Sequence, residues 1–272
     1  MNNKNLEEQF LGFYNTPSLF NENIYGIENF EFDKIELNAI DFTSLQITEK
    51  IPLGKRIERF FEFYIMNSNR YDMILNNIQI IENKNTLGEI DFILFDKKKN
   101  EFIHLELVYK FYIYDNRFPK ELDKYVGPNR NDTLIKKLTK LKEKQFPLLF
   151  RKETTDYLKN IDIDNIKQKL CFKANLFYFE NDFNNSFELI NNQCKKGLYI
   201  KYQDFIRNDV FKEYKYYMPH RFDWVSTFDI ADLWVDYAEI FKMVEVYYSM
   251  KKSPLLWMKN SNSSNWLFVT FS

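Results

Sequence analysis

Cysteine and histidine are scarce in this chain of 272 residues, which contains two of each. The cysteines are Cys171 and Cys194, the histidines are His104 and His220, and no Cys-x-x-Cys spacing occurs. A structural zinc site needs four such ligands at short spacings, so the sequence argues against one. Without a cysteine framework, a reducing cytoplasm is the expected environment.

The chain also lacks long apolar runs and an excess of charge of either sign. No run of about 18 apolar residues occurs, so we expect no membrane-spanning segment and no membrane partner. Residues 1–20 carry acidic residues near their start and no uninterrupted apolar stretch, which is not the pattern of a signal peptide. The net charge of −1 does not indicate a polyanionic partner, although a local basic patch stays open.

The composition is that of a globular protein, with 45% apolar and 28% charged residues. The length suffices for one large domain or two small ones. We expect an N-terminal helical and irregular extension over 1–50, a core over 51–180, and a mixed α/β addition over 181–272. No repeat or low-complexity linker marks these boundaries, and the last region is open to being part of the same domain.

The apolar pattern predicts a series of elements between residues 52 and 180. One helix presents a stripe at i, i+3, i+4, i+7 and i+8, formed by Ile57, Phe60, Phe61, Tyr64 and Ile65. The remaining predictions are strands over 71–82, 87–95 and 101–114, a helix over 132–146 and a strand over 168–180. The order is helix, three strands, helix, strand, which predicts an α/β (α+β) fold with a mixed sheet.

The flanking regions predict fewer elements. Residues 5–14 indicate a short helix, ended by "NTPS". In the last third, 197–205 and 265–271 are typical of strands, and 230–250 is typical of a helix.

Charged residues share faces of two predicted strands that a polar turn, "DKKKN", connects. Because alternate side chains of a strand point to the same face, Glu89 and Asp91 lie together on one strand. By the same alternation, His104, Glu106 and Lys110 lie together on the next. A hairpin would bring Asp91 and Glu106 within reach of one another, and two close carboxylates raise each other's pKa.

A divalent cation would resolve that repulsion. Mg²⁺ prefers hard oxygen ligands and uses one or two carboxylates together with water and substrate phosphate. A nearby lysine stabilises developing negative charge. The pattern therefore favours metal-assisted phosphodiester hydrolysis, with Mg²⁺ or Mn²⁺ as the cofactor.

These residues also resemble a known family pattern, that of the PD-(D/E)XK nucleases. "GEIDFIL" is similar to the aspartate strand of that superfamily and "HLELVYK" to its Glu-x-Lys strand. The resemblance narrows to a bacterial domain-of-unknown-function family, 1853, which is assigned to that superfamily. It is carried by "PLGKRIERFFEFYI", "TLGEIDFILFD", "HLELVYKFYIYD" and "YVGPNRNDTLIKKLTKLKEKQFPL", with weaker similarity at "FYNTPSLF" and "YMPHRFDWV".

The resemblance implies a restriction-endonuclease-like core and specific roles. Asp91 and Glu106 would be metal ligands, joined by Glu58 from the first helix, and Lys110 would be the catalytic lysine. The chain departs from the family spacing, which would place the lysine at Val108. Lys110 keeps the same face but lies about 6.6 Å further along the strand.

Structural interpretations stand beside each role. Glu58 is either a metal ligand or a helix residue paired with Lys55 or Arg59. Asp91, Glu106 and Lys110 are either a site or a structural ion-pair set, because a buried lysine needs a partner.

Three further residues are candidates for supporting roles at the rim of the site. Glu89 is either a supporting group or a rim charge. His104 is either a structural hydrogen-bonding residue or part of the site. Gln145 is a candidate for a supporting residue.

Basic residues after the strands are candidates for nucleic-acid contacts. Helical spacing places Lys137, Lys140 and Lys144 on one side of the helix, and Arg130 just precedes it. Such a side would bind phosphates, or it is an ordinary solvated face.

The leading hypothesis is a metal-dependent nuclease, with DNA favoured over RNA as its partner. The alternative is a catalytically inactive nuclease-fold protein that binds nucleic acid or a protein partner. A protein partner or homo-oligomer remains open under both.

Overall fold

The structure is a computed structural model that describes residues 3–48, 51–159, 161–226 and 233–271. The chain divides into two compact units, each built from stretches that are separated in the sequence. Unit 1 comprises Met1–Pro17, Lys110–Ile135 and Ala174–Ser272. Unit 2 comprises Ser18–Tyr109 and Lys136–Lys173, and it contains most of the predicted site.

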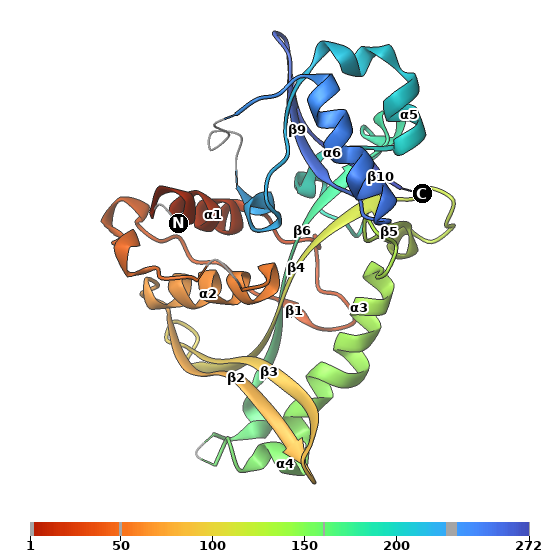
Figure 1. Ribbon diagram of the computed structural model, residues 1–272. Helices are drawn as coiled ribbons and strands as arrows, with labels where there is room; N and C mark the ends of the chain where they lie inside the picture. Colours follow the sequence, from red (N-terminus) through yellow and green to blue (C-terminus); the bar gives the residue numbers. More distant parts are fainter. Residues whose placement is uncertain (1–2, 49–50, 160, 227–232, 272) are drawn as a thin grey trace. The chain divides into compact units, whose positions relative to one another are not determined.

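Figure 1 shows the helices and strands coloured along the chain and labels most of them. The helices are α1 Asn3–Asn15, α2 Leu53–Met66, α3 Leu134–Lys140, α4 Lys152–Thr155, α5 Tyr202–Arg207 and α6 Tyr237–Ser249. The strands are β1 Glu28–Asn29, β2 Tyr71–Glu82, β3 Asn85–Asp96, β4 Glu101–Tyr114, β5 Tyr125–Val126, β6 Lys167–Tyr178, β7 Lys195–Lys201, β8 Lys215–Tyr217, β9 Leu255–Lys259 and β10 Ser264–Thr270. The order helix, three strands, helix, strand is therefore present as α2, β2, β3, β4, α3 and β6, with short elements inserted.

The fold is mixed α/β. Within the described ranges, ten strands form one sheet, in the order β2-β3-β4-β6-β7-β10-β9-β8, with β1 beside β6 and β5 beside β4. β2, β3 and β4 pair antiparallel, whereas β6, β7 and β10 pair parallel. β9 and β8 continue antiparallel from β10, so the sheet is mixed, as predicted.

In unit 2, α2 buries its apolar stripe against the β2–β3–β4 part of the sheet. The five predicted stripe residues are at most 2% exposed. The ring of Phe61 lies 4.8 Å from the ring of Phe92 in β3. Phe92 is the register partner of Leu105 in β4, so these two side chains belong to the sheet face that α2 covers.

The opposite face of these strands is covered by η5, the 3₁₀ segment Phe146–Phe150. Leu148 and Leu149 pack with Ile90 and Ile93 in one buried cluster. A Cβ added at Gly88 would lie 2.9 Å from Leu148, so a glycine allows this close packing. Glu106 lies on this side as well, because Gln145, the residue before η5, donates to its carboxylate.

Unit 1 has its own core, built from β7 to β10 and the helices α5 and α6. Phe205, Tyr216, Ile240 and Leu256 are fully buried in it. On α1, Gly12 approaches η10 (Arg221–Val225) so closely that an added Cβ would lie 1.8 Å from the Val225 carbonyl oxygen. A side chain is therefore excluded at this contact.

Three predicted elements differ from the structure. Residues 202–205, predicted as strand, begin α5, because Tyr202 and Phe205 bury one helical side at i and i+3 spacing. The helix predicted over 230–250 begins at Tyr237, where the Asp236 side chain accepts the Glu239 N–H at 3.0 Å; residues 230–232 lie outside the described ranges. The helix predicted over 132–146 begins at Leu134 and becomes π-helical over Leu141–Gln145, the segment η4.

Candidate functional site

Two carboxylates meet where the β3–β4 ladder ends. The last register partners are Phe92 and Leu105, so the same register places Asp91 opposite Glu106. Directly opposite Cβ atoms lie about 4.5–5.5 Å apart, and like charges there are destabilising. The Asp91 Oδ2 atom accepts the Leu107 backbone N–H at 2.8 Å, so a side chain takes the place of the next ladder bond. The predicted approach of Asp91 and Glu106 is present.

Both carboxyl groups are held in a desolvated environment. Glu106 is fully buried, whereas part of Asp91 remains exposed. Burial, and then the charge of Glu106, raises the pKa of Asp91 to about 7. Burial also raises the pKa of Glu106, and the charges of Lys137 and Lys140 oppose the rise. The pair therefore holds a proton, or requires a cation, near neutral pH.

Glu106 accepts hydrogen bonds on both of its oxygens. The Gln145 Nε2 donates to Oε2, and the His104 Nε2 lies 3.2 Å from Oε1. The Gln168 Nε2 lies 3.3 Å from His104 Nδ1, so Nδ1 is the acceptor and the proton sits on Nε2. His104 is fully buried, and burial lowers its pKa to about 4, so the ring is neutral at pH 7. His104 and Gln145 thus orient the Glu106 carboxylate.

Lys137 reaches this group from α3. Its Nζ donates to the Gln145 Oε1 at 2.9 Å, and Gln145 in turn donates to Glu106. Lys140 and Lys144 are exposed on the same segment, while Lys137 is half-buried. The three lysines predicted on one side of the helix therefore have different surroundings. Lys137 lies at the carboxylate pair, and Lys140 and Lys144 face solvent.

Glu58 and Glu89 share one lysine. The Lys55 Nζ lies 2.8 Å from Glu58 Oε2 and 3.0 Å from Glu89 Oε1. Burial raises the pKa of Glu58, and the Lys55 charge opposes this rise. Of the two partners predicted for Glu58, Lys55 is the one observed, and Arg59 instead pairs with Glu62 at 2.6 Å.

Lys110 and Arg130 belong to unit 1, and each makes an ion pair there. The Lys110 Nζ lies 2.7 Å from Asp132 Oδ2, and the Arg130 Nη1 lies 2.7 Å from Asp115 Oδ2. Asp132 packs directly on Gly127: a Cβ added at Gly127 would lie 2.1 Å from the Asp132 Oδ1 atom. Lys110 thus has a carboxylate partner, as a partly buried lysine requires, and that partner is Asp132.

The acidic side chains of the site are candidate ligands for a metal ion. Among the described residues, no group of three or more His, Cys, Asp or Glu side chains is placed to hold one. Asp91, Glu106 and Glu58 therefore do not form a three-ligand cluster in this arrangement. Two carboxylates that face each other across neighbouring strands do fit a hard divalent ion, because Mg²⁺ often takes one or two and fills its shell with water and phosphate.

Several residues of this site were not predicted from the sequence in these roles. Lys137 was predicted only as a phosphate contact, Lys55 only as a partner of Glu58, and Gln168 not at all. Gln168 precedes a buried stretch of β6, and no local pattern relates it to His104, which lies 64 positions earlier. The i, i+3 spacing of Lys55 and Glu58 is a usable signal, because such pairs meet on a helix.

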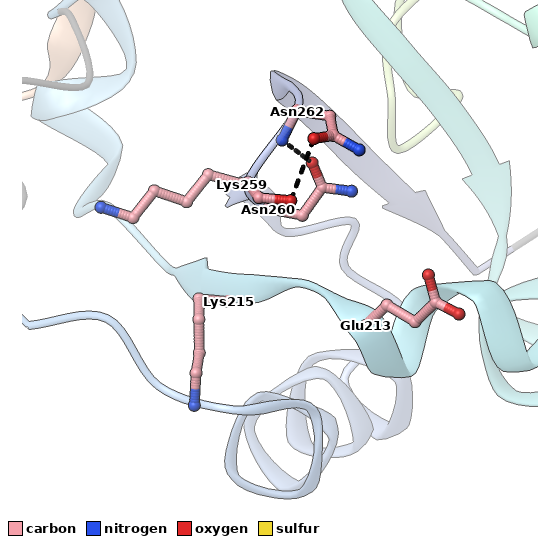
Figure 2. Close-up of a pocket in the computed structure, with 6 residues that line it drawn as sticks. Glu213, Lys215, Lys259, Asn260 and Asn262 are labelled. Atoms are coloured by element: carbon pink, nitrogen blue, oxygen red, sulfur yellow. Dashed lines mark hydrogen bonds between the residues drawn. The ribbon is translucent and has the colours of Figure 1, made fainter.

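A separate cavity of about 480 Å³ lies in unit 1 (Figure 2). Lys215 and Lys259 line it together with Glu213 and the turn between β9 and β10. Lys215 and Lys259 are register partners, and in Figure 2 their side chains extend in different directions. The carboxylate pair of unit 2 is not part of its lining.

Fold and site together define a mixed α/β protein with two opposed cross-strand carboxylates, of which Glu106 is buried and Asp91 is partly exposed. The chain belongs to the family described as domain of unknown function (DUF1853), whose sequence profile matches residues 28–268. No curated protein and no solved structure matches the chain. Within the described residues, none of the helices has the length and apolar character needed to cross a membrane.

Proposed function

We propose that this protein is a metal-dependent phosphodiesterase of the PD-(D/E)XK nuclease type that hydrolyses DNA or RNA. The observation that carries the proposal is the pair Asp91 and Glu106, opposed across two strands, with the Asp91 carboxylate held by the Leu107 N–H. Such a pair is costly to maintain unless a proton or a cation compensates it. The family resemblance of the same two residues supports the cation.

Each residue has a defined task in this proposal. Asp91 and Glu106 would hold Mg²⁺ or Mn²⁺, which supplies Lewis-acid polarisation of a phosphate oxygen. The Leu107 N–H fixes one Asp91 oxygen, and His104 and Gln145 fix both Glu106 oxygens. Such supporting hydrogen bonds set ligand orientation and basicity. Hydrolysis adds water across one P–O bond, with the water oxygen bonding to phosphorus and a proton passing to the leaving oxygen.

The test is cleavage of labelled DNA and RNA, single- and double-stranded, with Mg²⁺ or Mn²⁺. We expect Asp91→Ala and Glu106→Ala to lower the rate by about 10²-fold or more, because each removes a charged group aimed at the reacting phosphate. Asp72→Ala is the control, since Asp72 is an exposed β2 carboxylate paired with Lys97. Unchanged cleavage in both site variants would refute the assignment.

The second candidate is a nuclease-fold protein that binds nucleic acid or a protein without turnover. It is favoured by the ion pairs of Lys110 with Asp132 and of Glu58 with Lys55, which occupy two of the groups that the family resemblance assigns to catalysis. It requires that binding persists in Asp91→Asn and that no product forms with either metal. Metal-dependent product would eliminate it.

A further inference from the structure

The candidate site lacks a lysine at the position that the Glu-x-Lys spacing assigns, because that position is Val108. Lys110 pairs with Asp132 at 2.7 Å, and Lys55 bridges Glu58 and Glu89. In both cases the ammonium already faces carboxylates, which compensate its charge. Within the described residues, neither lysine makes an ion pair with Glu106.

Lys137 is connected to the carboxylate pair by two consecutive hydrogen bonds. Its Nζ donates to the Gln145 Oε1 at 2.9 Å, and the Gln145 Nε2 donates to Glu106 Oε2. The link is through a neutral amide, which carries no charge of its own. The β3–β4 register sets Asp91 opposite Glu106, so the lysine, the amide and both carboxyls lie in one group.

The π-helical segment η4 explains how Gln145 reaches Lys137. The two residues are eight positions apart, and in a regular α-helix they would be separated by about 80° around the axis. Residues 141–145 have i→i+5 hydrogen bonds, which turn the chain more slowly and reduce that offset. Single π turns of this kind occur frequently at functional sites.

The exposure and the charge of Lys137 are both consistent with a place beside the carboxylate pair. Glu106 is fully buried, whereas Lys137, Gln145 and Asp91 each keep part of their side chain exposed. A substrate can therefore contact these three but not Glu106 directly. Lys137 also brings a positive charge to a group that contains two acidic side chains.

We propose that Lys137 is the catalytic lysine of this site, contacting the scissile phosphate from α3, and that Gln145 is the positioning residue that holds it beside Glu106. The inference rests on the proposed phosphodiesterase function and names the group that stabilises its developing charge. Lys110 then has a structural role through Asp132.

The experiment compares Lys137→Ala, Lys137→Arg, Lys110→Ala and the control Lys136→Ala, whose lysine is exposed on the same helix. We expect Lys137→Ala to lower kcat by about 10²- to 10³-fold with a small change in KM, the size seen when one preorganised donor is lost. Lys137→Arg should recover part of that loss, and Lys136→Ala should stay within about twofold of wild type. Circular dichroism melting checks that each variant is folded.

A second readout does not require turnover. Removing the Lys137 charge beside two carboxylates should tighten Mn²⁺ binding at pH 8 several-fold, measured by calorimetry, and Lys136→Ala should not. If the wild type cleaves and Lys137→Ala keeps wild-type kcat while Lys110→Ala loses it, the inference is wrong and the proposed function stands. If the wild type does not cleave, the proposed function fails, and the catalytic role of Lys137 fails with it.

Discussion

At the residue scale, the determining feature is a pair of acidic groups that the fold holds together at a cost. Asp91 and Glu106 are desolvated and mutually repulsive, and their pKa values are raised as a result. Hydrogen bonds from Leu107, Gln145 and His104 recover part of that cost. Groups arranged in this unfavourable way are typical of functional sites, where the charge is needed for chemistry.

Replacing Asp91 with asparagine should therefore separate stability from activity. The asparagine oxygen can still accept the Leu107 N–H, and its amide can donate to Glu106, so the repulsion is removed. We expect the free energy of unfolding of the metal-free protein at pH 8 to rise by about 1–3 kcal/mol, since each pKa unit corresponds to about 1.4 kcal/mol. Urea unfolding measures this, and a variant less stable than wild type would contradict it.

The same groups predict how stability depends on pH. A carboxyl whose pKa is raised on folding binds more protons in the folded state, so stability falls as pH rises towards the folded pKa. His104, with a pKa lowered to about 4, acts in the opposite sense below its unfolded pKa of about 6.5. Above that pH the ring is neutral in both states, and the Asp91 and Glu106 carboxyls are the groups of this site that still titrate.

We therefore expect the metal-free protein to lose about 1–2 kcal/mol of stability between pH 6.5 and pH 8. Urea titrations at several pH values in this interval give the slope. Asp91→Asn should flatten it, because the variant has no carboxyl at that position. A flat profile in the wild type would show that the pair is ionised in both states.

At the scale of elements, contacts between backbone segments determine the geometry of the site more than the helix or strand propensity of single residues does. The ladder between β3 and β4 ends at Phe92 and Leu105, and the next position becomes the carboxylate pair. The segment after α3 changes from α-helical to π-helical and then to 3₁₀ within eleven residues, 140–150, before β6. Pro147 favours the last change, because it lacks an N–H for the helix.

The close contact between Gly12 of α1 and the Val225 carbonyl group of η10, in unit 1, can be tested by substitution. Gly12→Ala would place a Cβ 1.8 Å from the Val225 carbonyl oxygen, so α1 or η10 must move. We expect a loss of about 3 kcal/mol in the free energy of unfolding, at the upper end for overpacking. The control is Gly54→Ala in α2, where nothing lies within 4 Å of the added Cβ, and which should be neutral or slightly stabilising. Equal effects of the two substitutions would contradict the contact.

At the scale of the whole molecule, ion binding and folding are linked. Any ion that binds the folded state alone stabilises it in proportion to its free concentration relative to Kd. Because the proposed ligands are buried and opposed, the unfolded chain has no equivalent site.

Mn²⁺ at 100 times its Kd should therefore stabilise the protein by about 2.7 kcal/mol. The readout is the melting temperature with Mn²⁺ against a potassium salt of equal ionic strength. Asp91→Ala should abolish the difference, and Asp72→Ala should preserve it. A shift of equal size in Asp91→Ala would place the binding site elsewhere in the chain.

Local patterns predicted much of unit 2. The stripe of α2 is buried as its 3.6-residue period requires, and β2 and β4 have the predicted bounds. Alternation along β3 and β4 correctly placed Asp91 and Glu106 together, because hairpin register carries that information. The i, i+3 pair of Lys55 and Glu58 also followed from local spacing.

Contacts between residues far apart in the sequence could not be predicted from local patterns. Lys110 shares the Glu106 face by alternation, yet its partner Asp132 comes from a loop 22 positions later. The π turn that brings Gln145 to Lys137 has no sequence signature in a lysine-rich helix. The interleaved composition of the two units likewise follows from packing between distant segments.

By itself, the sequence determined the local elements, the mixed sheet and the placing of two carboxylates on one side of a hairpin, because those depend on short-range periodicity. Apart from the local pair of Lys55 and Glu58, the tertiary structure decided which cation faces which carboxylate. Ion pairing depends on distances of a few ångströms between elements that are far apart in the chain, and these distances are set by how the helices pack on the sheet. Here the packing of distant segments pairs Lys110 with Asp132 and Lys55 with Glu89, and it brings Lys137 to the group around Glu106.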